Sequence, residues 1–406
     1  MNKISLWAGS MLACGMMSVS CTNDSGSDSA ASVSKTEVVS SYSNLVLTNY
    51  QDALAKAELM KTAIDAFVAA PTEAGFLAAK EAWLASRLPY GQTEAFRFYD
   101  GPIDAEGGPE GQLNAWPMDE VYLDYVVGQP NSGIINETSI EITKSRIANL
   151  NEGGEDDVLG LGANFDAEKS ISSGYHAIEF LLWGQDFNAT GPGERSWQDY
   201  LTDENATAPN GDRRGQYLQL STELLVDDLS SLVNSWTVDN SENYRNKDFA
   251  SLSDDEALKA IITAIGILAK GELAGERIDV ALSTTEQEDE HSCFSDNTYT
   301  DVYANALGIQ NVYLGNYGDS YTGKSISDMV AATNPSLDGE MKQLLSDILT
   351  TTQGLPLTFD QVIATQDSEG WAKLNEIVIK LQTVGDRLVD VASELGLGTI
   401  SVELPE

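Results

Sequence analysis

Apolar residues recur at the three- and four-residue spacing of amphipathic helices along most of the chain. No run alternates apolar and polar positions as a half-buried strand would. We therefore predict an all-α fold. The predicted helices lie at residues 38–70, 73–88, 140–150, 167–183, 217–236, 253–283, 297–314, 338–352 and 368–395, the sixth opened by a capping box at Ser253–Glu256.

Long irregular connections are predicted at residues 89–117, 188–214 and 284–297. The middle connection leaves several helices on each side, enough for a four-helix unit in each part. We predict two helical-bundle halves, residues 38–200 and 210–396.

The N-terminus has the order of a secretory signal. Lys3 precedes about 14 largely apolar residues, fewer than the roughly 20 that cross a bilayer, and small residues then lead to Cys21. This order predicts a lipoprotein-type signal peptide at residues 1–20, a lipidated Cys21 and a polar tether at residues 22–37. An ordinary signal peptide cleaved near Ser20 is the alternative.

The chain carries 63 acidic against 23 basic residues, a formal net charge of −40. Such a surface repels nucleic acid and anionic lipid headgroups, so we expect no nucleic-acid partner and membrane contact through the lipid anchor only. Such a surface attracts cations, but acidic charge on an exported protein more often serves its solubility. If the N-terminal cysteines are removed or lipidated, Cys293 is the remaining thiol, and no internal disulfide is expected.

His176 and Glu179 are three residues apart and share one face of a predicted helix that is otherwise apolar all round. Such a helix is buried, and a buried carboxylate is costly unless it is paired or binds a metal. The alternatives are a structural pair, with Glu179 bonded to an arginine, and a metal or acid/base site. His291 is the other histidine, so multi-histidine zinc sites are excluded, and a carboxylate-rich site suits iron or another divalent cation.

Further candidates lie in the second half. Glu272, Glu276 and Asp279 are spaced i, i+4 and i+7, which predicts an acidic stripe that is either solvated or meets a cation. Arg277 on the same helix is a candidate partner for Glu179. The acidic segment before His291 is either an exposed loop or part of a set that joins His291 to His176.

In the first half, Arg87 and Glu94 flank a turn predicted at Pro89 and Gly91. We predict a salt bridge between them.

The sequence resembles the imelysin family. The resemblance rests on Gly-x-His-x-x-Glu at residues 174–179, on segments 82–104 and 271–277, and on Glu288–Thr298, which is similar to the iron-regulated protein A branch. These motifs occur in order, and the match spans about residues 40 to 395.

The resemblance implies two helical halves with a site between them and an envelope location tied to iron acquisition. We therefore expect a lipid-anchored, periplasm-facing protein, on the outer rather than the inner membrane, that binds iron or an iron-carrying partner. The candidate ligands are His176, Glu179, Glu276, Arg277, Asp279 and His291, supported by Arg87, Glu94 and Glu272.

Two other functions stay open. The family also carries a metallopeptidase label, under which His176 and Glu179 bind a metal. The residues supply neither an evident third ligand nor a general base, so an enzyme is disfavoured. The other alternative is an interaction protein that docks an envelope transport protein without a metal.

Overall fold

The computed structural model describes residues 33–153, 157–162, 165–188, 190–366 and 368–404. Residues 33–406 form one compact unit. The predicted signal peptide, Cys21 and most of the predicted tether lie outside the described residues. Among the residues described, no helix combines the length and hydrophobicity needed to cross a bilayer.

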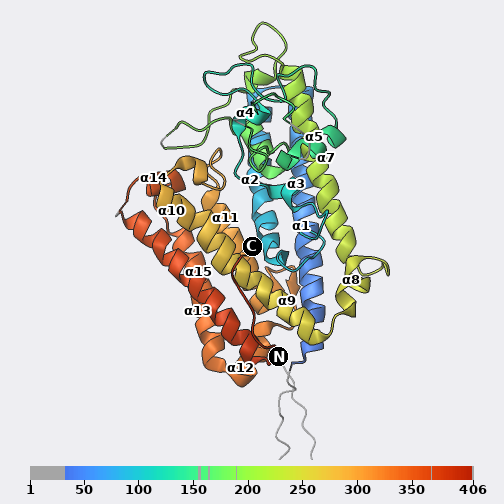
Figure 1. Ribbon diagram of the computed structural model, residues 1–406, viewed down its shortest axis with the longest axis vertical. Coiled ribbons are helices and arrows are strands. Elements are labelled where there is room, and N and C mark those ends of the chain that lie inside the picture. Colours follow the sequence, from blue (N-terminus) through green and yellow to red (C-terminus); the bar gives the residue numbers. More distant parts are fainter. Residues whose placement is uncertain (1–32, 154–156, 163–164, 189, 367, 405–406) are drawn as a thin grey trace, which may run out of the picture. The chain divides into compact units, whose positions relative to one another are not determined.

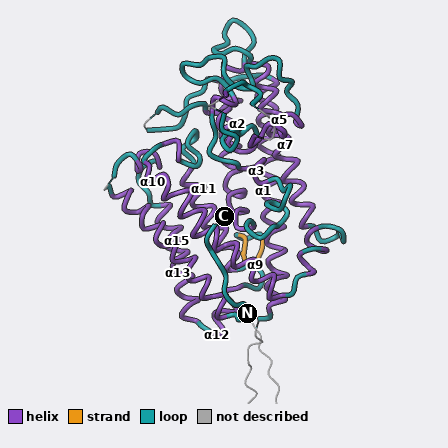
Figure 2. The backbone as a smooth tube through the Cα atoms, in the orientation of Figure 1, coloured by secondary structure: helices purple, strands orange, loops and turns teal. Residues whose placement is uncertain are grey.

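The predicted all-α fold is confirmed (Figure 1). Figure 2 shows helix over most of the described chain, with many of the irregular segments near α2, α5 and α7. The described strands are β1, Asn316–Tyr317, and β2, Tyr321–Thr322, which pair antiparallel.

The first two helices, α1 (Lys35–Ala69) and α2 (Glu73–Thr93), pack along each other. The predicted end of the second helix at residue 88 is wrong, because α2 continues through Pro89. Proline removes one helical hydrogen bond, but burial of Tyr90 and a bond from Asn49 Nδ2 to the Pro89 carbonyl oxygen, 2.9 Å, hold this turn in the core. Tertiary packing thus outweighs the local break.

Short helices and loops connect α2 to the next long helix, α7. α6 begins only at Gly174, later than the predicted start at residue 167. The elements are η1 (Glu94–Phe96), α3 (Glu110–Asn114), α4 (Glu120–Leu123), α5 (Lys144–Leu150), η2 (Asn151–Gly153), α6 (Gly174–Trp183) and η4 (Trp197–Tyr200).

The helix after the central loop, α7 (Gly211–Trp236), packs along α1 and against α6 (Figure 1). It was predicted to belong to the second half, so helices do not group strictly by their order in the sequence. The division into residues 38–200 and 210–396 stays a prediction. Two short helices, α8 (Tyr244–Lys247) and η5 (Phe249–Ser251), follow α7.

The remaining helices pack around a long composite helix. α9 (Asp254–Ile267) continues into the π-helix η6 (Leu268–Asp279) and then into α10 (Val280–Thr284), and α15 packs against both α9 and η6. α11 packs against α2 and α13. The other bounds are η7 (Gln287–Asp289), α11 (Thr298–Leu314), α12 (Ile326–Thr333), α13 (Pro335–Gln353), α14 (Phe359–Ile363) and α15 (Glu369–Glu394).

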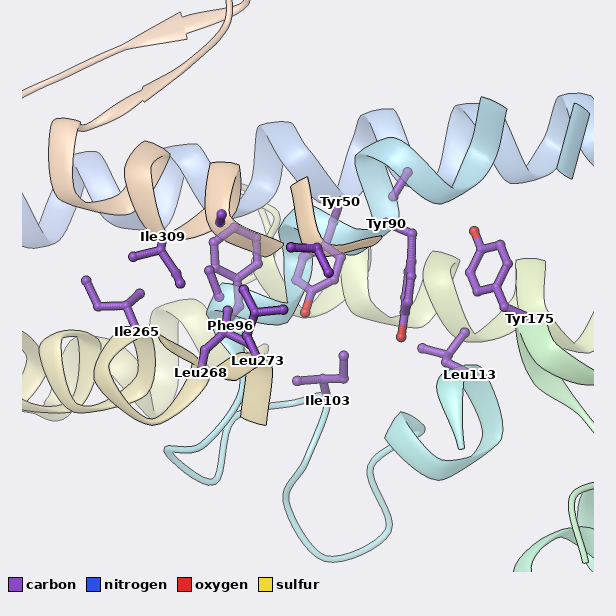
Figure 3. Packing of buried hydrophobic residues seen from close by; sticks show 14 of the residues in the cluster. Tyr50, Tyr90, Phe96, Ile103, Leu113, Tyr175, Ile265, Leu268, Leu273 and Ile309 are labelled. Atoms are coloured by element: carbon purple, nitrogen blue, oxygen red, sulfur yellow. The ribbon is translucent and has the colours of Figure 1, made fainter. Parts of the chain in front are cut away.

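A continuous core joins helices from both ends of the sequence. Tyr50 of α1, Tyr90 of α2 and Tyr175 of α6 belong to the same buried cluster as Leu273 of η6 and Ile309 of α11 (Figure 3). Polar groups buried between these helices are therefore enclosed by apolar side chains on several sides.

The predicted capping box of α9 is confirmed and allows a simple test. Ser253 Oγ accepts from the Glu256 backbone N–H at 3.3 Å, and Glu256 Oε2 accepts from the Ser253 N–H at 2.8 Å. We expect Ser253→Ala to lower the free energy of unfolding by about 1 kcal/mol in urea titrations. Ser231→Ala, at an exposed position within α7, is the control. Equal stabilities of the two variants would contradict a role for the cap.

Candidate functional site

The glycine of the Gly-x-His-x-x-Glu motif begins α6, in which every residue is buried. Gly174 has a φ of +82°, and a Cβ there would lie 2.6 Å from the Leu113 carbonyl oxygen. Glycine is therefore required where α6 starts against α3. This close approach carries His176 and Glu179 into the core.

Glu179 uses both carboxyl oxygens. Oε2 lies 2.9 Å from His176 Nδ1, and Oε1 accepts from the backbone N–H and the hydroxyl of Ser295 at 2.9 and 2.6 Å. Burial raises the pKa of Glu179 to about 8 although the Ser295 bonds oppose it. The predicted Arg277 partner was wrong, since a histidine and a serine meet this carboxyl group.

His176 keeps one ring nitrogen free of any hydrogen bond. The residue is 1% exposed, and its Nε2 atom is buried without a partner among the described residues. Burial, helped by the charge of Arg87, lowers the pKa of His176 to about 3. The imidazole is therefore neutral near pH 7.

His291 lies edge-on against His176, with ring centroids 4.6 Å apart and an interplanar angle of 79°. Its Nδ1 atom is 2.9 Å from Asp301 Oδ2, and burial lowers its pKa to about 3. The structure thus brings the two predicted histidines together. Each has a carboxyl group at Nδ1, an arrangement that orients the ring and directs Nε2 to a ligand in many metal sites.

Arg87 holds Asp301, the carboxylate that orients His291, in place. Its Nε and NH2 atoms lie 3.1 and 3.0 Å from Asp301 Oδ1, and Ser292 also donates to Asp301. Burial opposes ionisation, but Arg87 and His291 outweigh it and hold the pKa of Asp301 well below its usual value. The predicted Arg87–Glu94 salt bridge was wrong: Arg87 NH1 reaches Asn114 Oδ1 at 2.8 Å, and Asn114 in turn bonds Glu94 at 3.4 Å.

Glu94 is paired with two arginines. Arg277 NH2 lies 2.7 Å and Arg97 NH1 2.9 Å from Glu94 Oε2. Arg277 also reaches Glu272 Oε1 at 2.8 Å and Asn305 Oδ1 at 2.7 Å. Burial disfavours the charge of Glu94, but Arg277 and Arg97 outweigh it and lower its pKa to about 2.

The π-helix explains which second-half residues reach the site. Its hydrogen bonds run from i to i+5, as Gly275 O to Val280 N–H shows, so Glu272 and Arg277 share a face. The predicted stripe assumed an α-helix; its solvated alternative agrees with Glu276 and Asp279, whereas Glu272 pairs with Arg277. Glu276 and Asp279 are exposed and do not join the cluster.

Several contributors were missed by sequence reasoning. Asp301, Ser295 and Asn114 hold the predicted residues in place, but sequence reasoning singled out none of them. The available signals were the position of Ser295 within the segment Glu288–Thr298 and of Asp301 as an acidic residue early in a correctly predicted helix. Ser295 acts partly through its backbone, which sequence does not display.

A cavity of about 330 Å³ lies near His291, although neither histidine lines it. Trp116 lines it and lies 5.5 Å, ring centroid to ring centroid, from His291. Cys293 and Phe294 form another part of the wall. Its acidic lining, with Lys169 as the basic residue, consists of Asp119, Glu120, Asp166, Glu288 and Asp289.

Within the described ranges, no group of three or more His, Cys, Asp or Glu side chains is arranged to hold a metal. Among the predicted carboxylates, Glu179 orients His176, Glu94 and Glu272 pair with Arg277, and Glu276 and Asp279 are exposed. The protein therefore offers two oriented imidazoles rather than a complete coordination shell.

The family model described as Imelysin (Peptidase_M75) matches residues 46–388. The chain belongs to the imelysin family. This imelysin-family protein is 25% identical over 306 residues to "Iron-regulated protein A" of Synechococcus elongatus, covering 74% of this chain and 69% of that protein.

Two solved structures share the imelysin fold of this chain. An iron-regulated protein A precursor from Parabacteroides distasonis gives a TM-score of 0.65 at 19% identity, covering 90% of this chain and 97% of the other. An imelysin-like protein from Psychrobacter arcticum gives 0.60 at 14% identity, covering 92% and 98%. At these identities the likeness concerns the fold.

Proposed function

We propose that this imelysin-family protein acts in iron acquisition at the cell envelope and binds ferrous iron, free or as a chelate, at His176 and His291. The observation that carries the proposal is the buried Nε2 atom of His176, which has no partner among the described residues while Glu179 occupies Nδ1. A buried nitrogen without a partner is costly, and a cation at Nε2 would remove that cost.

The surroundings support a cation as cargo. Imidazole is a suitable ligand for iron, and the acidic lining of the adjoining cavity favours approach of positive charge. Water or a small chelator would supply the remaining ligands. The relative's name, iron-regulated protein A, supports a link to iron, since it describes regulation by iron.

The proposed location rests on Cys21. A lipid there, followed by the polar tether, would hold the imelysin domain at a membrane surface, facing the periplasm. The metallopeptidase and transporter-docking hypotheses stay predictions.

Anaerobic calorimetric titration of the purified protein with Fe²⁺ tests the proposal. We expect one saturable site, and His176→Ala should weaken binding at least about 100-fold because it removes a ligand nitrogen. The control is the double variant Glu276→Gln/Asp279→Asn, which removes two exposed charges and should bind like the wild type. Equal affinity of wild type and a folded His176→Ala protein would assign binding to the acidic surface and overturn the proposal.

A further inference from the structure

A second cavity, of about 520 Å³, lies at the C-terminal end of α6. Trp183, the last residue of α6, lines it together with Tyr125, Val127, Phe187 and Arg195. Trp183 follows His176 by seven positions, or about 10 Å along a helix. The cavity is therefore separate from the histidine pair, and its volume falls in the range of small-molecule sites.

Apolar side chains stand exposed at this cavity. Val127 is 77% and Phe187 71% exposed, the highest values among the large hydrophobic residues described. Gln185, which also lines the cavity, holds the Val127 backbone in place, since its Oε1 accepts from the Val127 N–H at 2.7 Å while its Nε2 donates to Glu120 outside the cavity. Exposed apolar groups around a concave surface indicate a ligand with an apolar body.

Positive charge lies beside the aromatic wall. Lys80 does not line the cavity itself, but its ammonium lies 5.1 Å from the centre of the Trp183 ring and 4.8 Å from that of Phe76, and it forms no hydrogen bond or ion pair with the residues described. Burial, together with the charge of Arg195, lowers the pKa of Lys80 to about 8, while Glu194, an exposed residue that lines the cavity, opposes this. A cation without an acidic hydrogen-bond partner, in a chain of net charge −40, favours an anionic ligand nearby.

Arg195 adds a second cationic group. It pairs with Asp124 at 2.6 Å, stacks over Tyr125 and Phe180 at 4.9 and 5.2 Å, and keeps a buried Nε atom without an acceptor. Arg214 shares the same Asp124 carboxylate at 2.7 Å. The guanidinium is thus held rigidly at the cavity wall by groups that do not use all its donors.

We infer that this cavity binds a small aromatic carboxylate, with the ring against Trp183, Tyr125 and Phe187 and the carboxylate toward Lys80 and Arg195. Aromatic walls accept the ring, and the two cations select the charged group. The inference is independent of iron binding, because it uses neither histidine.

The test compares 2-naphthoate with 2-naphthamide, which has the same ring system but no charge, by equilibrium titration of the full chain. We expect saturable binding of one naphthoate and at least about tenfold weaker binding of the amide. Lys80→Gln should weaken naphthoate binding about tenfold and leave the amide unchanged.

A matched pair of valines provides the control. Val127→Glu places a negative charge at the cavity and should weaken naphthoate binding at least about tenfold. Val238→Glu makes the same change at a residue that is 59% exposed and does not line the cavity, so it should have no effect. Both positions are exposed, so both variants should fold. Absent naphthoate binding, equal binding of the amide, or equal behaviour of the two valine variants would each overturn the inference.

Discussion

Glu179→Gln is expected to leave the protein folded while weakening Fe²⁺ binding about 10- to 100-fold. Ser295 donates its backbone N–H to Glu179 Oε1, so the glutamine must place its oxygen there. Its amide NH₂ then faces His176 Nδ1 and donates to it. The ring must carry its own hydrogen on Nε2, which leaves that atom without a lone pair for a metal.

Folding should survive this change because glutamine copies the protonated form of the side chain. Burial raises the pKa of Glu179 to about 8, so the metal-free folded protein holds this proton at neutral pH, and Fe²⁺ binding at His176 Nε2 has to release it, which the glutamine cannot do. The unfolded chain releases it near the ordinary value, so the contribution of Glu179 to wild-type stability falls as pH rises from about 5 to 8. Glutamine does not titrate, so the stability of the variant relative to the wild type should increase over the same pH range.

Calorimetry and urea unfolding across pH 5–8 check both parts of this expectation. Glu179→Ala is the contrasting variant, because it removes the hydrogen bonds to both His176 and Ser295 and should reduce stability as well as binding. Wild-type affinity in a folded Glu179→Gln protein would show that His176 Nε2 is not the ligand atom.

Arg87→Met should lower the free energy of unfolding by about 3–5 kcal/mol, because it leaves the buried Asp301 carboxylate without its cationic partner. Arg87 and Asp301 are each 1% exposed, and the arginine also holds Asn114 at 2.8 Å. Methionine fills similar space without charge, so lost volume contributes little. Denaturant unfolding at pH 7 measures the difference.

The matched control is Arg387→Met at a surface pair. Arg387 Nε lies 2.7 Å from Glu340, a shorter contact than those of Arg87 with Asp301, but its side chain is 36% exposed. Exposed pairs contribute no more than about 1 kcal/mol. A loss at Arg87 as small as that at Arg387 would show that the core tolerates an unpaired Asp301.

Helix positions could largely be predicted, because each long helix shows its own apolar period. The departures arose where packing overruled local preference. Pro89 lies within α2 because Tyr90 beyond it is buried, and residues 268–279 adopt a π-helix that the same apolar spacing does not distinguish from an α-helix. That difference in helix type also decided which acidic residues face the site.

The candidate site was partly predictable for a related reason. His176 and Glu179 stand out as polar groups in an apolar helix, and His291 as the other histidine. Their pairing could not be predicted, since it depends on how α6 meets the loop before α11, which carries His291 and Ser295. Arg277 is the clearest example. It was predicted to pair with Glu179, but in the wider turn of the π-helix it forms an ion pair with Glu94.

The contacts that close the site join residues far apart along the chain. Arg87 and Asp301 are separated by 214 positions, Arg277 and Glu94 by 183, and Ser295 and Glu179 by 116. A chain interrupted during synthesis before residue 295 would have the motif helix but not the groups that satisfy it. If the protein binds iron as proposed, that binding therefore requires the chain at least as far as Asp301.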